Sequence, residues 1–174
     1  MSLKNSIFLD FSLDQKYIFV FKENKFYKKK IVSLKRSENI GSIFFDFIKK
    51  NKIEIDDTYF IFINLGPGNL IAIRNCIVFA KMLSLFFGCS LMGFSHYQIL
   101  RLNNKKVRKA LITLGDKTLL LDLLKKSVKK VSKVEISKFR YPKYKIVYNK
   151  EILKNLVLSN NFKKKVSPIS YSNV

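Results

Sequence analysis

The sequence predicts a mixed α/β fold with two lobes, the second of them reduced. Three observations predict this class. Short segments rich in β-branched and aromatic residues begin the chain, an apolar strand at residues 59–63 leads through a Gly-Pro-Gly turn into an apolar helix, and a thinner set of elements follows Ser95. An entirely apolar strand is typical of a sheet that is covered on both faces. We expect a first lobe at residues 1–94 and a smaller lobe with a basic tail at residues 95–174.

Three strands are predicted at residues 7–11, 17–21 and 26–33, because polar turns separate these β-rich segments. A helix is predicted at residues 37–50, where five apolar side chains share one face: Ile40, Ile43, Phe44, Phe47 and Ile48. With the later strand and helix, the order is three strands, helix, strand, helix. This is the order of a half-domain in the actin-like ATPase fold (the ASKHA class, which is RNase H-like), and its strand–helix–strand crossover should be right-handed.

The turn after the apolar strand contains Gly66, Pro67 and Gly68. Both glycines can adopt a positive φ, and the proline restricts φ between them. Asn69 is placed to cap a helix at residues 70–87. A glycine-rich turn before a helix can also hold a phosphate, but neither the P-loop pattern nor the dinucleotide-binding pattern is present. A tight, capped turn is therefore the favoured interpretation.

The second lobe is predicted to begin with a capping box, in which Ser95 is followed three residues later by Gln98, and a helix that continues to about residue 102. The remaining elements are a hairpin turned at Gly115-Asp116, a third strand, a short strand, a short helix and a basic, partly mobile tail. The hairpin has strands at residues 107–114 and 118–124, and the third strand is expected at 128–136. The short strand is expected at 145–148, the short helix at 151–158 and the tail at 162–174.

The helix at residues 70–87 has more apolar surface than one sheet can cover. Its polar residues lie on one side and the rest is apolar; these polar residues are Arg74, Asn75, Lys81 and Ser84. A helix lying on one sheet needs an apolar stripe about 100° wide. The excess must be buried by another helix or by another chain, and Phe45 on the preceding helix adds to it. The alternative, that the two helices simply cover each other, is left open.

The strand, turn, helix and following Gly-x-Ser resemble the TsaB (YeaZ) family, which belongs to the tRNA threonylcarbamoyladenosine pathway. The matching residues are Gly66, Pro67, Gly68, Arg74, Ala80, Lys81, Gly93, Ser95 and Gln98. The sequence departs from the family pattern at four positions, where the family has Ser, Phe, Thr and Gly: Asn69, Leu70, Ile71 and Ala72. The resemblance is strong over residues 59–98 and looser over residues 7–124.

The resemblance implies an accessory protein that binds the tRNA threonylcarbamoyl-transferase TsaD through first-lobe helices, with a TsaE-like ATPase joining the assembly. The active site would lie on the partner, so we expect no catalytic residue, metal or cofactor in this chain, and tRNA contact would be indirect. Arg74 would support the turn formed by Gly66, Pro67 and Gly68. The residues expected at the partner interface are Ile40, Phe44, Phe47, Ile73, Ile77, Lys81 and Phe86.

The candidate reactive residues do not form a recognisable site. Asp10 ends the first strand and is interpreted as a turn former, because the glycines that bind phosphate in actin-like ATPases do not follow it. His96 is the only histidine and is interpreted as a surface residue of a helix start, without partners for catalysis. Cys76 and Cys89 lack metal-binding spacing and are expected to be buried thiols.

The net charge of +22 suggests an anionic partner, because 34 residues are basic and 12 are acidic. Only five of the basic residues are Arg, the residue preferred for bidentate phosphate contacts, so a bias toward A and T in the codons is the favoured explanation. Arg74 and Lys81 interrupt the apolar helix, and no leader pattern begins the chain. We therefore expect a cytoplasmic protein that does not span a membrane. The alternatives are a self-associating scaffold (a homodimer), a lysine-rich RNA-binding module and a small ATPase.

Overall fold

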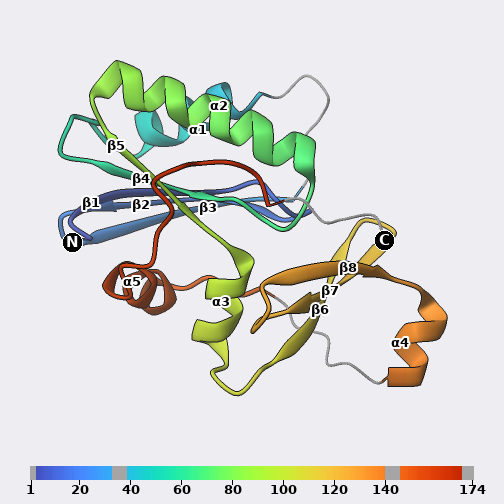
Figure 1. The fold of residues 1–174 in the computed structure, drawn as a ribbon. Helices are drawn as coiled ribbons and strands as arrows, with labels where there is room; N and C mark the ends of the chain where they lie inside the picture. Colours follow the sequence, from blue (N-terminus) through green and yellow to red (C-terminus); the bar gives the residue numbers. More distant parts are fainter. Residues whose placement is uncertain (1–2, 33–38, 140–145, 170–174) are drawn as a thin grey trace.

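The computed structural model describes residues 3–32, 39–139 and 146–169, and it has a mixed α/β architecture (Figure 1). The larger sheet has the strand order β3-β2-β1-β4-β5. Its strands are β1 (Asn5–Asp10), β2 (Lys16–Lys22), β3 (Lys25–Ile31), β4 (Phe60–Asn64) and β5 (Ser90–Phe94). The first three pair antiparallel, and β4 and β5 run parallel to β1, so the sheet is mixed. The predicted meander and element order of the first lobe are confirmed.

Helices cover both faces of this sheet. On one face lie α1 (Ile40–Lys50) and α2 (Leu70–Phe87), and on the other lie α3 (His96–Asn103) and α5 (Lys150–Leu158) (Figure 1). Alternate residues of each strand point to opposite faces, so β1 places Ile7 in the core under α1 and α2 and Phe8 in the core under α5. The prediction that the apolar β4 is covered on both sides is confirmed.

A second sheet contains three antiparallel strands in the order β6-β7-β8, and a short helix, α4 (Lys133–Phe139), follows it. The strands are β6 (Lys109–Leu114), β7 (Lys117–Asp122) and β8 (Ser127–Val131). The third strand was predicted to continue to residue 136, and this is wrong. Ser132 and Glu135 form a capping box, in which each side chain accepts the other residue's backbone N–H, and this starts α4.

Two expectations for the C-terminal region also differ from the structure. Residues 146–148 form no strand, and Tyr148 turns its side chain into a buried polar cluster. The segment after α5 is not a loose tail over its described part. Lys163 pairs with Gly93 through two backbone hydrogen bonds of 2.9 Å, and the backbone N–H of Ile169 donates to Leu65 at 2.8 Å. Residues 140–145 and 170–174 lie outside the described residues, and the division at residue 94 stays a prediction.

The Gly-Pro-Gly turn is packed against the turn that follows β1. Gly66 has the predicted positive φ, at 99°, but Gly68 does not. Gly68 is required for a different reason: a Cβ there would lie 2.8 Å from the carbonyl carbon of Ser12 and closer still to its oxygen. That carbonyl also accepts the backbone N–H of Asn69 at 2.7 Å, and the Asn69 side chain caps α2 as predicted. Arg74 is exposed and makes no hydrogen bond or ion pair with the described residues, and its role in supporting the turn stays a prediction.

Replacing Gly68 with alanine is expected to lower the free energy of unfolding by about 3 kcal/mol, because the new methyl group would overlap a fixed backbone carbonyl. Urea unfolding measures this change. Gly41→Ala is the matched control, since Gly41 lies in α1 and a Cβ there would meet only side-chain atoms, the Asn39 oxygen at 3.3 Å and the Phe79 ring at 3.6 Å. Alanine in the helix should raise stability by up to about 1 kcal/mol. Equal destabilisation by both variants would contradict the close-approach explanation.

Candidate functional site

The two sides of α2 are both apolar, but only one of them faces the sheet. Five side chains are buried against the sheet: Ile73, Cys76, Ile77, Ala80 and Leu83. The opposite side carries exposed apolar residues, which we call the α2 stripe. Its residues, with their exposed fractions, are Ile71 (71%), Val78 (58%), Met82 (53%), Leu85 (85%) and Phe86 (84%). The excess apolar surface predicted for this helix is confirmed.

Four residues of the α2 stripe form, together with Asn75, a row that resembles the seam of a helix that packs against another helix. Ile71, Asn75, Val78, Met82 and Leu85 recur at alternating intervals of four and three residues. Side chains at this spacing form a nearly straight row along one side of a helix. The row therefore provides a continuous contact surface along most of α2, and Asn75 is the polar residue within it.

A groove of about 780 Å³ extends the stripe toward α1. Phe45 of α1, which is 46% exposed, lines this groove together with Phe79 of α2. The rings of Phe44 and Phe79 pack edge to face at 5.3 Å, so the two helices do contact each other. This contact leaves the α2 stripe uncovered. The two helices therefore do not simply cover each other's surplus apolar surface.

The structure places the residues predicted for the partner interface in two different environments. Four of them lie in the core of this chain and cannot contact a partner as the chain stands: Phe44, Phe47, Ile73 and Ile77. Ile40 is partly buried, whereas Lys81 and Phe86 are exposed. Because α2 is apolar around most of its circumference, its sequence does not specify which side faces the sheet. The candidate surface consequently moves to the α2 stripe and Phe45.

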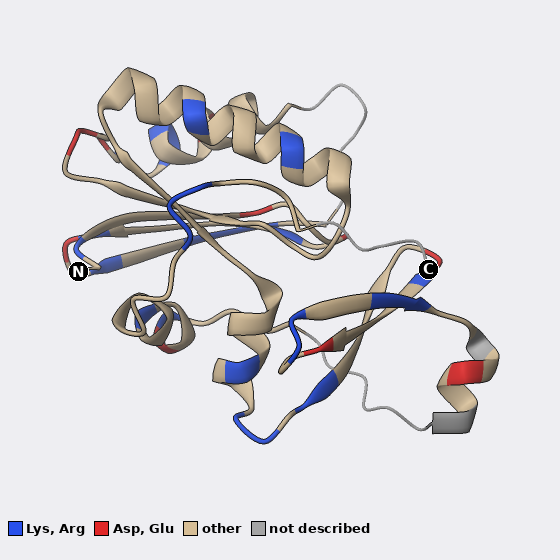
Figure 2. Cartoon of the chain, viewed as in Figure 1, with Lys and Arg blue, Asp and Glu red and all other residues tan. Residues whose placement is uncertain are grey.

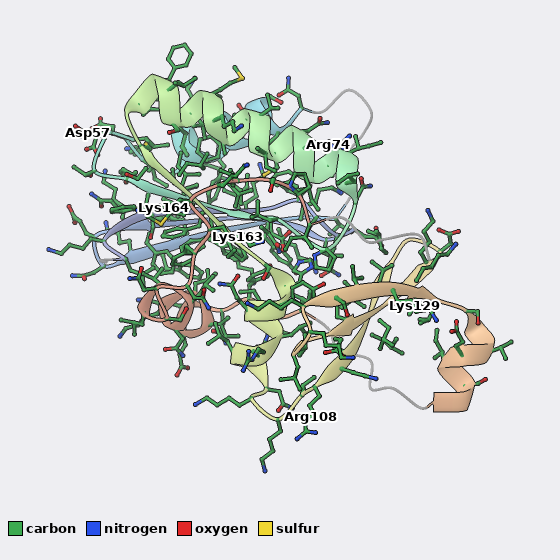
Figure 3. All side chains as sticks on the ribbon, viewed as in Figure 1. Asp57, Arg74, Arg108, Lys129, Lys163 and Lys164 are labelled. Atoms are coloured by element: carbon green, nitrogen blue, oxygen red, sulfur yellow. The ribbon has the colours of Figure 1, made fainter. Side chains whose placement is uncertain are left out.

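The charge beside the α2 stripe is of one sign. Arg74 and Lys81 are two turns apart and both exposed, and α2 contains no Asp or Glu (Figure 2). Figure 3 labels Arg74 on this helix. A partner with carboxylates beside its own apolar row would therefore be complementary to this face.

One helix among the described residues, α2, is long and apolar enough to span a membrane, with a mean hydropathy of 1.8. Its buried side supplies five core residues beside β4, so inserting it into a bilayer would dismantle the first core. Only 28% of the residues of α2 are buried, which is a low share for the core helix of a soluble protein. These two facts together favour a helix that stays on its sheet and leaves its other side exposed.

A second feature is a buried polar cluster at the carboxyl end of β1. His96 is fully buried, which overturns its interpretation as a surface residue. Its Nε2 lies 3.3 Å from Asp10 Oδ2 and 3.0 Å from Ser12 Oγ, and its Nδ1 lies 2.9 Å from the carbonyl oxygen of Pro67. Tyr148 donates its hydroxyl proton to Asp10 Oδ2, and Asn64 donates to the Tyr148 oxygen at 3.1 Å. The cluster thus connects β1, the Gly-Pro-Gly turn, α3 and the C-terminal segment.

Asp10 accepts hydrogen bonds on both carboxylate oxygens. The backbone N–H and the hydroxyl of Ser12 donate to Oδ1, at 3.0 Å and 2.5 Å, which confirms the predicted turn. Burial raises the pKa of Asp10, but the imidazole of His96 and hydrogen bonds from His96, Ser12 and Tyr148 outweigh burial and lower it from 3.8 to about 2. Burial and the Asp10 carboxylate raise the pKa of Tyr148 well above 10, so its hydroxyl remains a donor.

The geometry of this cluster differs from that of a Ser–His–Asp triad. In a triad the serine and the acid contact opposite ring nitrogens, whereas here Ser12 and Asp10 share Nε2 and the other nitrogen donates to Pro67. Ser12 is also fully buried, so a substrate cannot reach its hydroxyl. The arrangement suits a structural role, in which the hydrogen bonds of the cluster hold four segments of the chain together. The described residues contain no group of three or more His, Cys, Asp or Glu placed to hold a metal ion.

Both cysteines are buried free thiols, as predicted. Burial raises the pKa of Cys89 to about 11 and raises that of Cys76 further. A thiol is a poor nucleophile when its pKa is high, so neither residue is suited to nucleophilic catalysis at neutral pH.

The stability of the chain should depend on pH through Asp10. Its pKa is lower in the folded state than in the unfolded state, so its ionised form stabilises the fold above about pH 4, and this contribution disappears as the pH falls through about 2. We expect the stability difference between the wild type and Asp10→Asn to shrink by about 2 kcal/mol between pH 5 and pH 2. Urea unfolding at a series of pH values measures it. A difference that is constant over this range would contradict the assignment.

Comparisons with known proteins bear on the fold. No protein-family model matches the sequence, and a search of curated proteins finds no significant match. One similar solved structure is described as an uncharacterised protein with similarity to peptidase YeaZ from Pseudomonas aeruginosa; the TM-score is 0.65 at 10% identity, over 97% of this chain and 100% of that chain. Another is YeaZ from Pseudomonas aeruginosa, with a TM-score of 0.53 at 14% identity, over 74% of this chain and 64% of that chain. At these identities the likeness shows the fold alone, and the chain shares the mixed α/β fold of YeaZ-like proteins.

Proposed function

We propose that the chain has a TsaB-type role, as a non-catalytic partner of a TsaD-like tRNA threonylcarbamoyl-transferase in the threonylcarbamoyladenosine modification of tRNA. The observation that carries the proposal is the α2 stripe, a row of exposed apolar side chains on a first-lobe helix. The shared fold of YeaZ-like proteins and the sequence resemblance at residues 59–98 support the same role.

The energetics of the α2 stripe favour a protein partner. Burying one large apolar side chain contributes about 1.5–3 kcal/mol, and the stripe offers five such side chains next to Phe45. Contiguous exposed apolar surface of this kind marks interaction sites in soluble proteins. Arg74 and Lys81 at its edge would add specificity for a partner with acidic residues. The partner helix would lie along the row and fill the groove beside Phe45.

The buried cluster supports a non-catalytic role within an actin-like fold. Asp10 stands where actin-like ATPases place a carboxylate for the metal and nucleotide, but here its oxygens are occupied by Ser12, His96 and Tyr148. Glycines that could wrap a phosphate do not follow it. In this proposal the active site lies on the TsaD-like subunit, a TsaE-like ATPase joins the assembly, and the complex works in the cytoplasm.

Co-expression with a TsaD-like protein tests the proposal. We expect the two chains to elute together in size-exclusion chromatography, with a light-scattering mass equal to the sum of one copy of each. Separate elution of two folded proteins would overturn it. The mass of this chain alone tests the rival hypothesis of a self-associating scaffold, because the same row could pair with itself. A homodimer that persists in the presence of the TsaD-like protein would favour that rival.

A further inference from the structure

A second groove, of about 430 Å³, lies between α3, the turn joining β7 to β8, and the segment after α5. Three basic side chains line it, Arg101, Lys126 and Lys163, and none of its lining residues is acidic. We propose that this groove binds phosphate groups of a nucleic-acid backbone. The inference goes beyond the docking of a protein partner, because it concerns another surface and an activity of this chain alone.

The three basic residues come from separate elements that the fold holds in place. Lys163, which is labelled in Figure 3, belongs to the segment paired with β5. Its backbone N–H and its carbonyl both form hydrogen bonds with Gly93. Arg101 lies in the last turn of α3, and Lys126 occupies a tight turn with a φ of 52°. Gln98 of α3 donates its side-chain amide to the carbonyl of Asn161, which fixes the helix against the C-terminal segment. The positive charges therefore converge on a preformed groove, and long basic side chains suit phosphate oxygens.

A buried tyrosine among the lining residues also indicates a ligand with acceptor oxygens. Tyr97 is 4% exposed, and its hydroxyl has no hydrogen-bond partner among the described residues. Buried polar groups without a partner are rare and unfavourable. Burial and the nearby Asp122 raise the pKa of Tyr97 to about 12, so the hydroxyl keeps its proton. A phosphate bound in the groove would accept this unmade hydrogen bond once the side chains that cover the hydroxyl move aside.

The charge around the groove favours a polyanion over a small anion. Residues 95–139 include twelve Lys and Arg but only three Asp and Glu. Figure 2 shows basic positions on α3, on the loop after it and on β8. Such an excess of positive charge attracts the phosphodiester backbone over a distance larger than one phosphate. The groove would then anchor one segment of the backbone, and the surrounding lysines would add binding that is independent of base sequence.

The test compares two triple variants of the full chain that remove the same charge. One carries R101Q, K126Q and K163Q in the groove, and the control carries K25Q, K49Q and K50Q, which are exposed on the first lobe. Fluorescence anisotropy with a labelled RNA stem–loop, repeated at several salt concentrations, gives the affinity and its salt dependence. A DNA stem–loop of the same sequence, ATP and inorganic phosphate serve as separate probes. Y97F removes the unpaired hydroxyl and little else.

We expect the groove variant to bind RNA about tenfold more weakly than the control variant. The slope of log affinity against log salt should fall by about 2, because each of three lost phosphate contacts contributes about 0.7 to it. Y97F should weaken binding about fivefold without lowering the melting temperature. Similar DNA binding would indicate recognition of the phosphates alone, and tighter RNA binding would add a sugar contact; both support the proposal. Equal losses in the two triple variants would overturn it, and so would groove-dependent binding of ATP or phosphate without binding of either nucleic acid.

Discussion

Replacing Asp10 with alanine is expected to lower the free energy of unfolding by about 3–5 kcal/mol, which is a large part of the stability of a domain this size. Asp10 is 2% exposed, and its carboxylate accepts hydrogen bonds from Ser12, His96 and Tyr148. Its removal leaves these donors buried without an acceptor and breaks the hydrogen bond that joins Tyr148 to β1. Urea unfolding followed by circular dichroism measures the change.

Two further variants test whether the loss of stability comes from the buried cluster. Asp46→Ala removes an exposed carboxylate on α1 and should change stability by less than about 0.5 kcal/mol. Tyr148→Phe removes one of the donors and should cost about 1–3 kcal/mol, because the hydrogen bond is made to a charged group. A cost below about 1 kcal/mol for Asp10→Ala, similar to that of Asp46→Ala, would mean that the cluster does not hold the four segments together.

The double variant Val78→Glu and Leu85→Glu is expected to weaken binding to a TsaD-like protein by about 1,000-fold, because two carboxylates would be placed in the middle of an apolar contact. Both positions are exposed, at 58% and 85%, so the variant should keep the wild-type melting temperature. Isothermal titration calorimetry measures the affinity. Loss of binding together with retained stability is what distinguishes a docking surface from a core.

The matched control changes two exposed leucines elsewhere, Leu124 and Leu158, to glutamate. These residues lie on the β7–β8 turn and at the end of α5, away from α2. The control should bind as tightly as the wild type. If both double variants lost affinity to the same degree, the effect would come from net charge, and the α2 stripe would not be the docking surface.

Local signals predicted most of the elements in the chain. The predicted helix at residues 70–87 coincides with α2, because a side-chain cap from Asn69 and a left-handed Gly88 set its two ends. The alternation of β-branched and aromatic residues located the first four strands to within about two residues. The predicted strand does not continue past β8 because Ser132 and Glu135 form a capping box that starts α4, a signal that is present in the sequence.

The candidate sites were predicted less well, because they depend on long-range contacts. Apolar residues surround most of α2, so the sequence predicted surplus apolar surface but not that Ile73 and Ile77 face the sheet while Val78 and Leu85 face outward. The partners in the buried cluster are far apart in the chain, with His96 and Tyr148 both meeting Asp10. A single sequence carries no signal for such pairings. The groove beside Arg101 also depends on a long-range contact, because the backbone pairing of Lys163 with Gly93 of β5 places Lys163 at the groove.

Hydroxyl-radical footprinting of this chain, alone and with a TsaD-like protein, tests the docking surface most directly because it reports the exposure of individual side chains. Oxidation of Met82, Leu85 and Phe86 should fall strongly on adding the partner. Oxidation of Leu124 and Leu158, which are 62% and 67% exposed in the free chain, should stay unchanged. Unchanged oxidation along α2 in a complex that has formed would contradict the account.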